Sequence, residues 1–218
     1  MDYKKNQKYF KKTNKKGPII CIVIGLLIMM MGRGGIFIGL LLIAAGIGII
    51  VLQIKGAVSD EEYDASVASQ LNDMKQRALS KLGIDEDEVT EIEPIAISGY
   101  NYNGFNNAKR GKDNRWRTDR YRYALLFFSP NEVHCYTYDF KTTADEKTEA
   151  TDVYFYKDIV SVSTASETTK IYENDYNYET FKLTTAGGTA LTVSIRDMDN
   201  VQRSVNAMRQ LLRQKKQA

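Results

Sequence analysis

The densest group of side chains that could do chemistry lies between residues 109 and 122. It comprises seven cations and one tryptophan: Lys109, Arg110, Lys112, Arg115, Trp116, Arg117, Arg120 and Arg122. Cations interleaved with aromatic rings can contact anionic lipid head groups, an acidic protein surface or single-stranded nucleic acid. The alternative interpretation is a solvated loop whose cations offset the acidic segments around it. We expect a contact with anionic phospholipid or with a protein partner here, and we treat these eight residues as the candidate site.

A second pair, His134 and Cys135, suggests a base beside a nucleophile. Adjacent side chains on a strand point to opposite faces of the sheet, so these two groups cannot act together if the segment is a strand. His134 is the single histidine, and Cys21, the other cysteine, lies in an apolar run, so no zinc site of the usual type is expected. The residues 32–39, "GRGGIFIG", lack the third glycine of a dinucleotide-binding fingerprint. We therefore expect no enzymatic activity, no metal and no cofactor.

Charge is strongly segregated along the chain, although the net charge is only +3. The segments 1–17, 106–122 and 201–218 are basic, with net charges of +6, +5 and +5, whereas 56–105 and 123–200 are acidic, at −8 and −7. Everything after residue 55 sums to −5. This negative total argues against a general role in nucleic-acid binding.

The run from Pro18 to Ile54 contains no charged residue except Arg33. As one helix it would be ~55 Å long, whereas the hydrocarbon core of a bilayer is ~30 Å thick. Glycines around Arg33 allow a turn that leaves the guanidinium in water. The sequence therefore predicts two transmembrane helices, 18–32 and 36–54, joined by a turn at 32–35. Small residues along the second helix should let the two helices approach closely, with Ala44 and Gly48 at small-xxx-small spacing. These residues are Gly39, Ala44, Ala45, Gly46 and Gly48.

The orientation follows from the basic residues that precede the first predicted helix, which are Lys4, Lys5, Lys8, Lys11, Lys12, Lys15 and Lys16. Positive charge marks the cytosolic side, so residues 1–17 form a basic cytosolic segment and two crossings return the chain to the cytosol. We expect a protein of the cell membrane with two spans and a cytosolic soluble domain. The alternative is a single-span anchor that carries an exported domain.

Residues 55–93 are predicted to form an amphipathic helix followed by an acidic linker. Tyr63, Val67, Leu71, Met74, Ala78 and Leu82 recur at spacings of three and four and fall on one helical stripe. Ser59 or Asp60 suits the start of this helix, and Gly83 suits its end. Six acids between Asp85 and Glu93 form a solvated turn.

From residue 94 onward the chain favours strands. Seven runs rich in Tyr, Phe, Val, Ile and Thr follow one another: "IAISGYNY", "RYRYALLFFS", "EVHCYTYDF", "DVYFYKD", "IVSVSTA", "YETFKLTTA" and "TALTVSIRD". "SPNE" and "AGGT" are typical hairpin turns, whereas "KTTADEKTEAT" is predicted to be a polar loop. A helix follows, capped by Asp197 or Asp199, with an apolar face of Val201, Val205, Met208, Leu211 and Leu212. The tyrosines of "YENDYNYETF" could bind a peptide or simply cover the sheet.

This order of elements over residues 94–218, with phrases such as "ALLFFSPNEVHCYTYDF" and "YFYKDIVSVST", resembles the pleckstrin-homology-like (PH-like) superfold and its GRAM and bacterial relatives. It also resembles uncharacterised bacterial membrane proteins with a hairpin anchor before such a domain. The resemblance implies an α+β protein in which about seven antiparallel strands form a barrel or sandwich closed by a C-terminal helix. It also implies that the first long loop, here "NAKRGKDNRWRTDRYR", holds an anionic head group.

Together these features predict a non-enzymatic, membrane-anchored bacterial adaptor or scaffold. It would hold a PH-like domain at the cytosolic face and contact anionic lipid or a protein partner of unknown identity through the basic loop. The alternative is an exported, surface-anchored binding domain. Either form binds no nucleic acid.

Overall fold

The computed structural model describes residues 1–11, 16–30, 32–89 and 91–217. Lys12, Lys15 and Met31, which belong to the predicted basic segment and the predicted first span, lie outside the described residues. The chain divides into two compact units, one formed by Lys4–Tyr63 and the other by Met1–Tyr3 with Asp64–Ala218. The prediction of an α+β protein with an apolar N-terminal helix and antiparallel sheets is confirmed.

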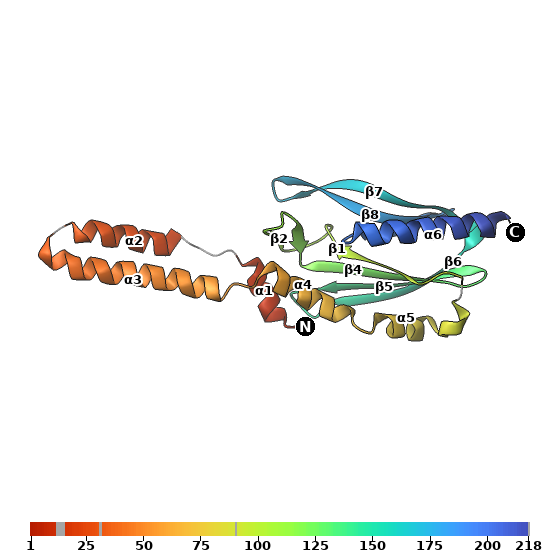
Figure 1. Ribbon diagram of the computed structural model, residues 1–218, viewed down its shortest axis with the longest axis horizontal. Helices are drawn as coiled ribbons and strands as arrows, with labels where there is room; N and C mark the ends of the chain where they lie inside the picture. Colours follow the sequence, from red (N-terminus) through yellow and green to blue (C-terminus); the bar gives the residue numbers. More distant parts are fainter. Residues whose placement is uncertain (12–15, 31, 90, 218) are drawn as a thin grey trace. The chain divides into compact units, whose positions relative to one another are not determined.

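The first unit contains two apolar helices, α2 (Lys16–Met29) and α3 (Arg33–Lys55), which run side by side (Figure 1). Their backbones touch at glycines, since a Cβ added at Gly25 would lie 2.8 Å from the carbonyl oxygen of Gly39. A Cβ at Gly46 would likewise lie 2.8 Å from the carbonyl oxygen of Pro18. Nothing lies within 4 Å of a Cβ added at Gly48, so the predicted contact through Ala44 and Gly48 is wrong. The close approach predicted for Gly39 and Gly46 is confirmed, and Gly25 of α2 takes part in it.

The connection between these helices lies before the predicted position. The helix α2 ends at Met29 and α3 begins at Arg33, so residues 33–35, which were predicted to be in the turn, are already helical. Gly32 supplies the positive φ of 101° that the connection requires. Within the described residues, α3 is the one helix that is long and apolar enough to cross a membrane by length and composition, whereas α2 has 14 residues.

The basic N-terminal segment contains a helix that the sequence did not suggest, α1 (Tyr3–Phe10). Its Tyr9 is buried because its ring stacks on Tyr63 at 4.2 Å between centroids and its hydroxyl donates to Asp60 Oδ1 at 2.7 Å. Asp60 begins α4 (Asp60–Ala68), where Ser59 and Glu62 form a capping box by accepting hydrogen bonds from each other's backbone N–H.

The predicted single helix over residues 59–82 is broken. The helix α4 continues as the 3₁₀ turn η1 (Ser69–Leu71), and α5 (Met74–Leu82) begins after Asp73 at a φ of 60°. Asn and Asp tolerate this left-handed region better than other residues with a side chain, which explains why the break occurs at "ND". Gly83 ends α5 in the same region, as predicted. The acidic linker that follows contains a short turn, η2 (Glu86–Glu88).

The second unit contains nine described strands in three antiparallel sheets. One sheet has the order β1-β4-β5-β6, from the strands Ile95–Tyr100, Arg120–Phe128, Glu132–Lys141 and Lys147–Phe155. A second has the order β7-β8-β9, from Ile159–Ile171, Asn174–Thr185 and Gly188–Ser194. The third is a small hairpin of β2 (Ala108–Arg110) and β3 (Trp116–Thr118). None of these sheets closes into a barrel, so the predicted barrel form is wrong.

The seven predicted strands correspond to β1 and to β4 through β9. The loop predicted over "KTTADEKTEAT" is confirmed at Thr142–Glu146 and is wrong from Lys147 onward, where the residues pair with β5. These residues are polar because β6 is an edge strand whose side chains are mostly exposed. The 3₁₀ turn η3 (Tyr156–Asp158) then leads from β6 into β7.

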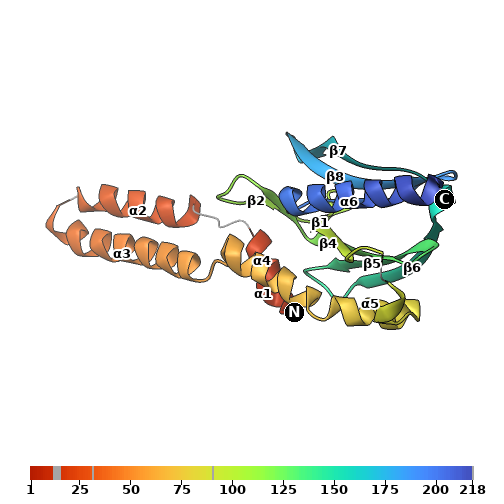
Figure 2. The ribbon, with the colours of Figure 1, turned by 45° about the vertical axis from the view of Figure 1, so that its right-hand side comes forward.

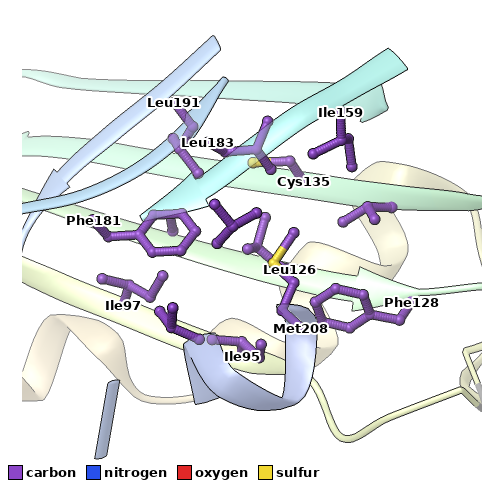
Figure 3. Packing of buried hydrophobic residues seen from close by; sticks show 14 of the residues in the cluster. Ile95, Ile97, Leu126, Phe128, Cys135, Ile159, Phe181, Leu183, Leu191 and Met208 are labelled. Atoms are coloured by element: carbon purple, nitrogen blue, oxygen red, sulfur yellow. The ribbon is translucent and has the colours of Figure 1, made fainter. Parts of the chain in front are cut away.

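The core of this unit lies between the two larger sheets and α6 (Met198–Gln217). In both views α6 lies between the strands β7 and β8 and the strands β1 and β4 (Figures 1 and 2). Its buried residues are Val201, Val205, Met208, Leu211 and Leu212, which confirms the predicted apolar face. Figure 3 shows Met208 meeting Leu126 and Phe128 of β4, with Phe181 of β8 in the same cluster.

Candidate functional site

The basic stretch is folded instead of forming an open loop. Residues 108–118 make the β2–β3 hairpin, in which Lys109 pairs with Arg117 and Arg110 pairs with Trp116. The N–H of Gly111 donates to the carbonyl of Arg115 at 2.9 Å, and Asn114 takes a φ of 63° to close the turn. This geometry separates the eight predicted residues into buried and exposed groups.

Arg117 is the most buried of the eight, with 5% of its surface exposed. Its guanidinium donates bidentate hydrogen bonds to Asp64, at 2.9 and 2.8 Å, and to Asp113, at 2.9 Å each. The hydrogen bonds from Arg117 lower the pKa of Asp113 to about 2. Arg117 therefore joins two acids inside the domain, and its predicted contact with an outside ligand stays a prediction.

Asp64 is the centre of a hydrogen-bond network that includes Arg117. Besides the two bonds from Arg117, its carboxylate accepts the hydroxyl of Tyr100 at 2.6 Å and Nη2 of Arg196 at 2.7 Å. Four donors therefore converge on one carboxylate, from β1, β3 and the segment before α6. The network ties together strands and a loop that are far apart in sequence.

Trp116 is also buried, with 8% of its surface exposed, and its ring lies 6.1 Å from that of Tyr172 between centroids. Tyr172 holds the tip of the β7–β8 hairpin against β2, because its hydroxyl accepts from the N–H of Ala108 at 3.1 Å and donates to the carbonyl of Ala108 at 3.2 Å. The ring of Trp116 is therefore mostly enclosed by the protein, and its predicted contact with lipid or a partner stays a prediction.

Two further arginines belong to the four-stranded sheet. Arg122 donates bidentate hydrogen bonds to its cross-strand neighbour Asp139, at 2.7 and 2.9 Å, and a third to the carbonyl of Thr192 at 3.1 Å. Arg120 lies 3.6 Å from Glu146. Arg122 is thus engaged in joining the two sheets.

Four of the predicted cations remain on the hairpin, namely Lys109, Arg110, Lys112 and Arg115. Arg110, Lys112 and Arg115 are exposed, and Arg110 Nε donates to the carbonyl of Asn114 at 3.4 Å. Asp113, the acid of this turn, is engaged by Arg117. The exposed surface of the hairpin is therefore positive.

A cleft of about 370 Å³ lies next to this hairpin, with Arg115, Trp116 and Arg117 on one side. Residues on the other side come from β8 and from the segment after β9, and they include Tyr176, Tyr178, Glu179 and Arg196. The sequence missed Arg196 and Glu179, because nothing in the local pattern relates them to residues 109–122. The tyrosine cluster "YENDYNYETF" was the one signal that pointed to this wall of the cleft.

The tyrosines of the cleft pack on one another. Tyr102 lies 4.6 Å from Tyr178 and 5.2 Å from Tyr176 between ring centroids, and its hydroxyl donates to the carbonyl of Trp116 at 3.1 Å. Burial raises the pKa of Tyr102, and burial together with the hydrogen bond to Glu167 raises the pKa of Tyr178 to about 12. Both hydroxyls therefore remain protonated at neutral pH.

His134 and Cys135 point to opposite faces of β5, as the alternation of a strand requires. Cys135 is in the core, where burial raises the pKa of its thiol to about 12, whereas His134 Nε2 lies 3.0 Å from Ser129 Oγ. Across the described ranges, no three His, Cys, Asp or Glu side chains are grouped so as to hold a metal ion. No family model, no curated protein and no solved structure matches this chain.

Proposed function

We propose that the protein is a non-enzymatic adaptor of the bacterial cell membrane. In this proposal α2 and α3 form a transmembrane hairpin, and the β-rich unit is a PH-like domain that binds an acidic protein partner on the cytosolic side. The β2–β3 hairpin and the adjacent cleft supply the binding surface. His134 and Cys135 lie on opposite faces of β5, which supports a role in which this pair does not act as base and nucleophile.

The apolar surface of the first unit carries the proposal. Large side chains of α2 and α3 are exposed, including Leu27 at 60%, Phe37 at 80%, Leu41 at 71% and Leu52 at 72%. Each fully exposed leucine or phenylalanine forgoes ~1.5–3 kcal/mol of transfer free energy in water. A surface of this kind on two adjacent helices is what a bilayer covers.

The lengths of the same helices bear on the number of spans. The 23 residues of α3 extend ~35 Å, enough for the hydrocarbon core, whereas the 14 residues of α2 extend ~21 Å and require local thinning of the bilayer. The lysines before α2 favour a cytosolic N-terminus and hence a cytosolic C-terminus. The alternative, a single-span anchor with an exported domain, is favoured by the shortness of α2.

An acidic protein is preferred over anionic lipid as the partner. An interfacial lipid contact commonly uses an exposed tryptophan beside the cations, but Trp116 is enclosed. The exposed Arg115 instead borders a concave site with hydrogen-bonding side chains. The element order β1 and β4 through β9 followed by α6 supports the comparison with the PH-like superfold.

Extraction of membranes with alkaline carbonate tests the anchor. The full chain should remain in the membrane pellet, whereas a variant lacking residues 18–54 should move to the supernatant, because peripheral contacts do not survive this treatment. The matched control lacks residues 2–11, which deletes α1 but leaves both apolar helices, and it should remain in the pellet. Release of the full chain by carbonate would contradict the proposal.

A further inference from the structure

One edge of β8 is without a strand partner over half its length. The strand β7 pairs with β8 from Asn174 to Thr185, but β9 pairs only with Thr180–Thr185. After Ser194 the chain leaves the sheet and enters α6 at Met198. In the described part of the chain, residues 174–179 of β8 therefore have a neighbouring strand on one side only.

The direction of the backbone groups on this edge follows from one hydrogen bond. The N–H of Ile195 donates to the carbonyl of Glu179 at 2.8 Å, so the carbonyl of Glu179 points away from β7. The N–H and C=O of a strand residue point the same way and alternate between successive residues. The backbone groups of Asn177 and Asp175 therefore also point to the open side, where an added strand could pair with them.

This open edge borders the cleft. Tyr176, Asn177, Tyr178 and Glu179 line it on one side, and Arg115 with its neighbours on β3 lines it on the other. The six residues 174–179 span ~20 Å at ~3.3 Å per residue, so the unpaired edge can pair with a segment of about six residues. The cleft thus combines free main-chain hydrogen-bonding groups with side chains that can select a sequence.

The charges on the two sides determine the segment that fits. The hairpin side presents the exposed Arg115, whereas Asp113 is engaged by Arg117. The β8 side carries Glu179 and Asp175. A segment with acidic side chains on the face toward the hairpin and uncharged side chains on the other face is complementary to both.

We propose that the open edge of β8 binds an extended, acidic segment of a partner protein as an added β-strand. This inference rests on the proposed adaptor function and names its binding mode. Main-chain hydrogen bonds to Asn177 and Asp175 hold the segment, and Arg115 selects its acidic residues.

Binding of designed peptides to the full chain in nanodiscs of uncharged lipid tests this proposal. The probe is a fluorescein-labelled hexapeptide amide, Glu-Val-Glu-Val-Glu-Val, and its counterpart has Lys in place of Glu. Two further versions carry N-methyl groups on either the three Glu or the three Val amides. The acidic peptide should bind at least about tenfold more tightly than the lysine peptide, and one of the two methylated versions should bind about tenfold more weakly than the unmethylated one.

Substitutions on the edge supply the matched comparison. Asn177→Pro removes an N–H that faces the open side and should weaken binding about tenfold, whereas Asn177→Ala should keep it within about twofold. Arg115 lies outside β8, so Arg115→Glu tests the charge preference even if the proline variant does not fold. It should weaken binding of the acidic peptide about tenfold.

Three results would overturn the inference: no binding of the acidic peptide up to ~1 mM, equal binding of both methylated versions and the unmethylated peptide, or unchanged binding by a folded Asn177→Pro variant. Such a failure is distinct from failure of the anchor. If carbonate extraction still leaves the chain in the membrane, the proposed anchor stands and only the proposed binding mode is overturned.

Discussion

Replacing Arg117 by alanine should destabilise the β-rich unit by about 3 kcal/mol, because it leaves Asp64 and Asp113 without the guanidinium that joins them. For a unit of this size the midpoint of thermal unfolding should fall by about 10 °C. The fluorescence of Trp116, the single tryptophan and a neighbour of Arg117, reports unfolding of the full chain in detergent.

Two matched variants separate the effect of the bidentate hydrogen bonds of Arg117 from the effect of its charge. Arg117→Lys keeps the charge but cannot form two bidentate pairs, so its stability should lie between those of the alanine variant and the wild type. Arg110→Ala removes an exposed cation of the same hairpin and should change stability by less than ~0.5 kcal/mol. Equal stability of Arg117→Ala and Arg110→Ala would show that the network does not support the fold.

The same network predicts a pH dependence. The pKa of Asp113 is lowered from 3.8 to about 2 in the folded chain, so its carboxylate stays charged at pH values where the unfolded chain binds a proton. Its stabilising contribution is therefore present above pH 4 and is lost as the pH falls toward 2. In Arg117→Ala this part of the acid dependence should disappear.

Replacing Phe181 by alanine should destabilise the same unit by about 4 kcal/mol, through lost burial and the cavity that remains. Phe181 is fully buried among residues of both large sheets and α6 (Figure 3). Chemical denaturation monitored by Trp116 fluorescence measures the loss.

Val160→Ala is the control for this substitution, because Val160 is an apolar residue at the start of β7 that is 62% exposed. Its replacement should change the free energy of unfolding by ~0.5 kcal/mol or less. If Phe181→Ala unfolds at the same denaturant concentration as this control, the two sheets and α6 do not share a core.

The β-rich fold could largely be predicted from the sequence, because period-two and helical patterns record which side chains are buried. All five residues predicted for the apolar face of α6 are buried, and all seven predicted strands exist. The sequence did not reveal the α4–α5 break, which depends on Asp73 taking a left-handed conformation that other residues around it do not require. It also missed α1, whose Tyr9 is buried only because Tyr63 stacks on it.

The candidate site could be predicted only in part. Composition identified the basic stretch, but it could not show which cations are paired, since one of the two acids that engage Arg117 is Asp64, 53 residues earlier. Lys109, Arg110, Lys112 and Arg115 stay on the proposed binding surface, whereas Trp116, Arg117 and Arg122 are used within the domain. The open edge of β8 is a property of sheet topology, and no local pattern records it.

The proposed topology, a doubled anchor with a cytosolic domain, is tested most directly by reporters fused to the C-terminus and expressed in a bacterial host. Green fluorescent protein fused there should be fluorescent, and alkaline phosphatase, which requires export to form its disulfides, should be inactive. A fusion after Gly32, between the two apolar helices, should give active phosphatase and serves as the positive control. Active phosphatase at the C-terminus, with a non-fluorescent green fluorescent protein fusion, would contradict the account and would favour the exported, single-span alternative.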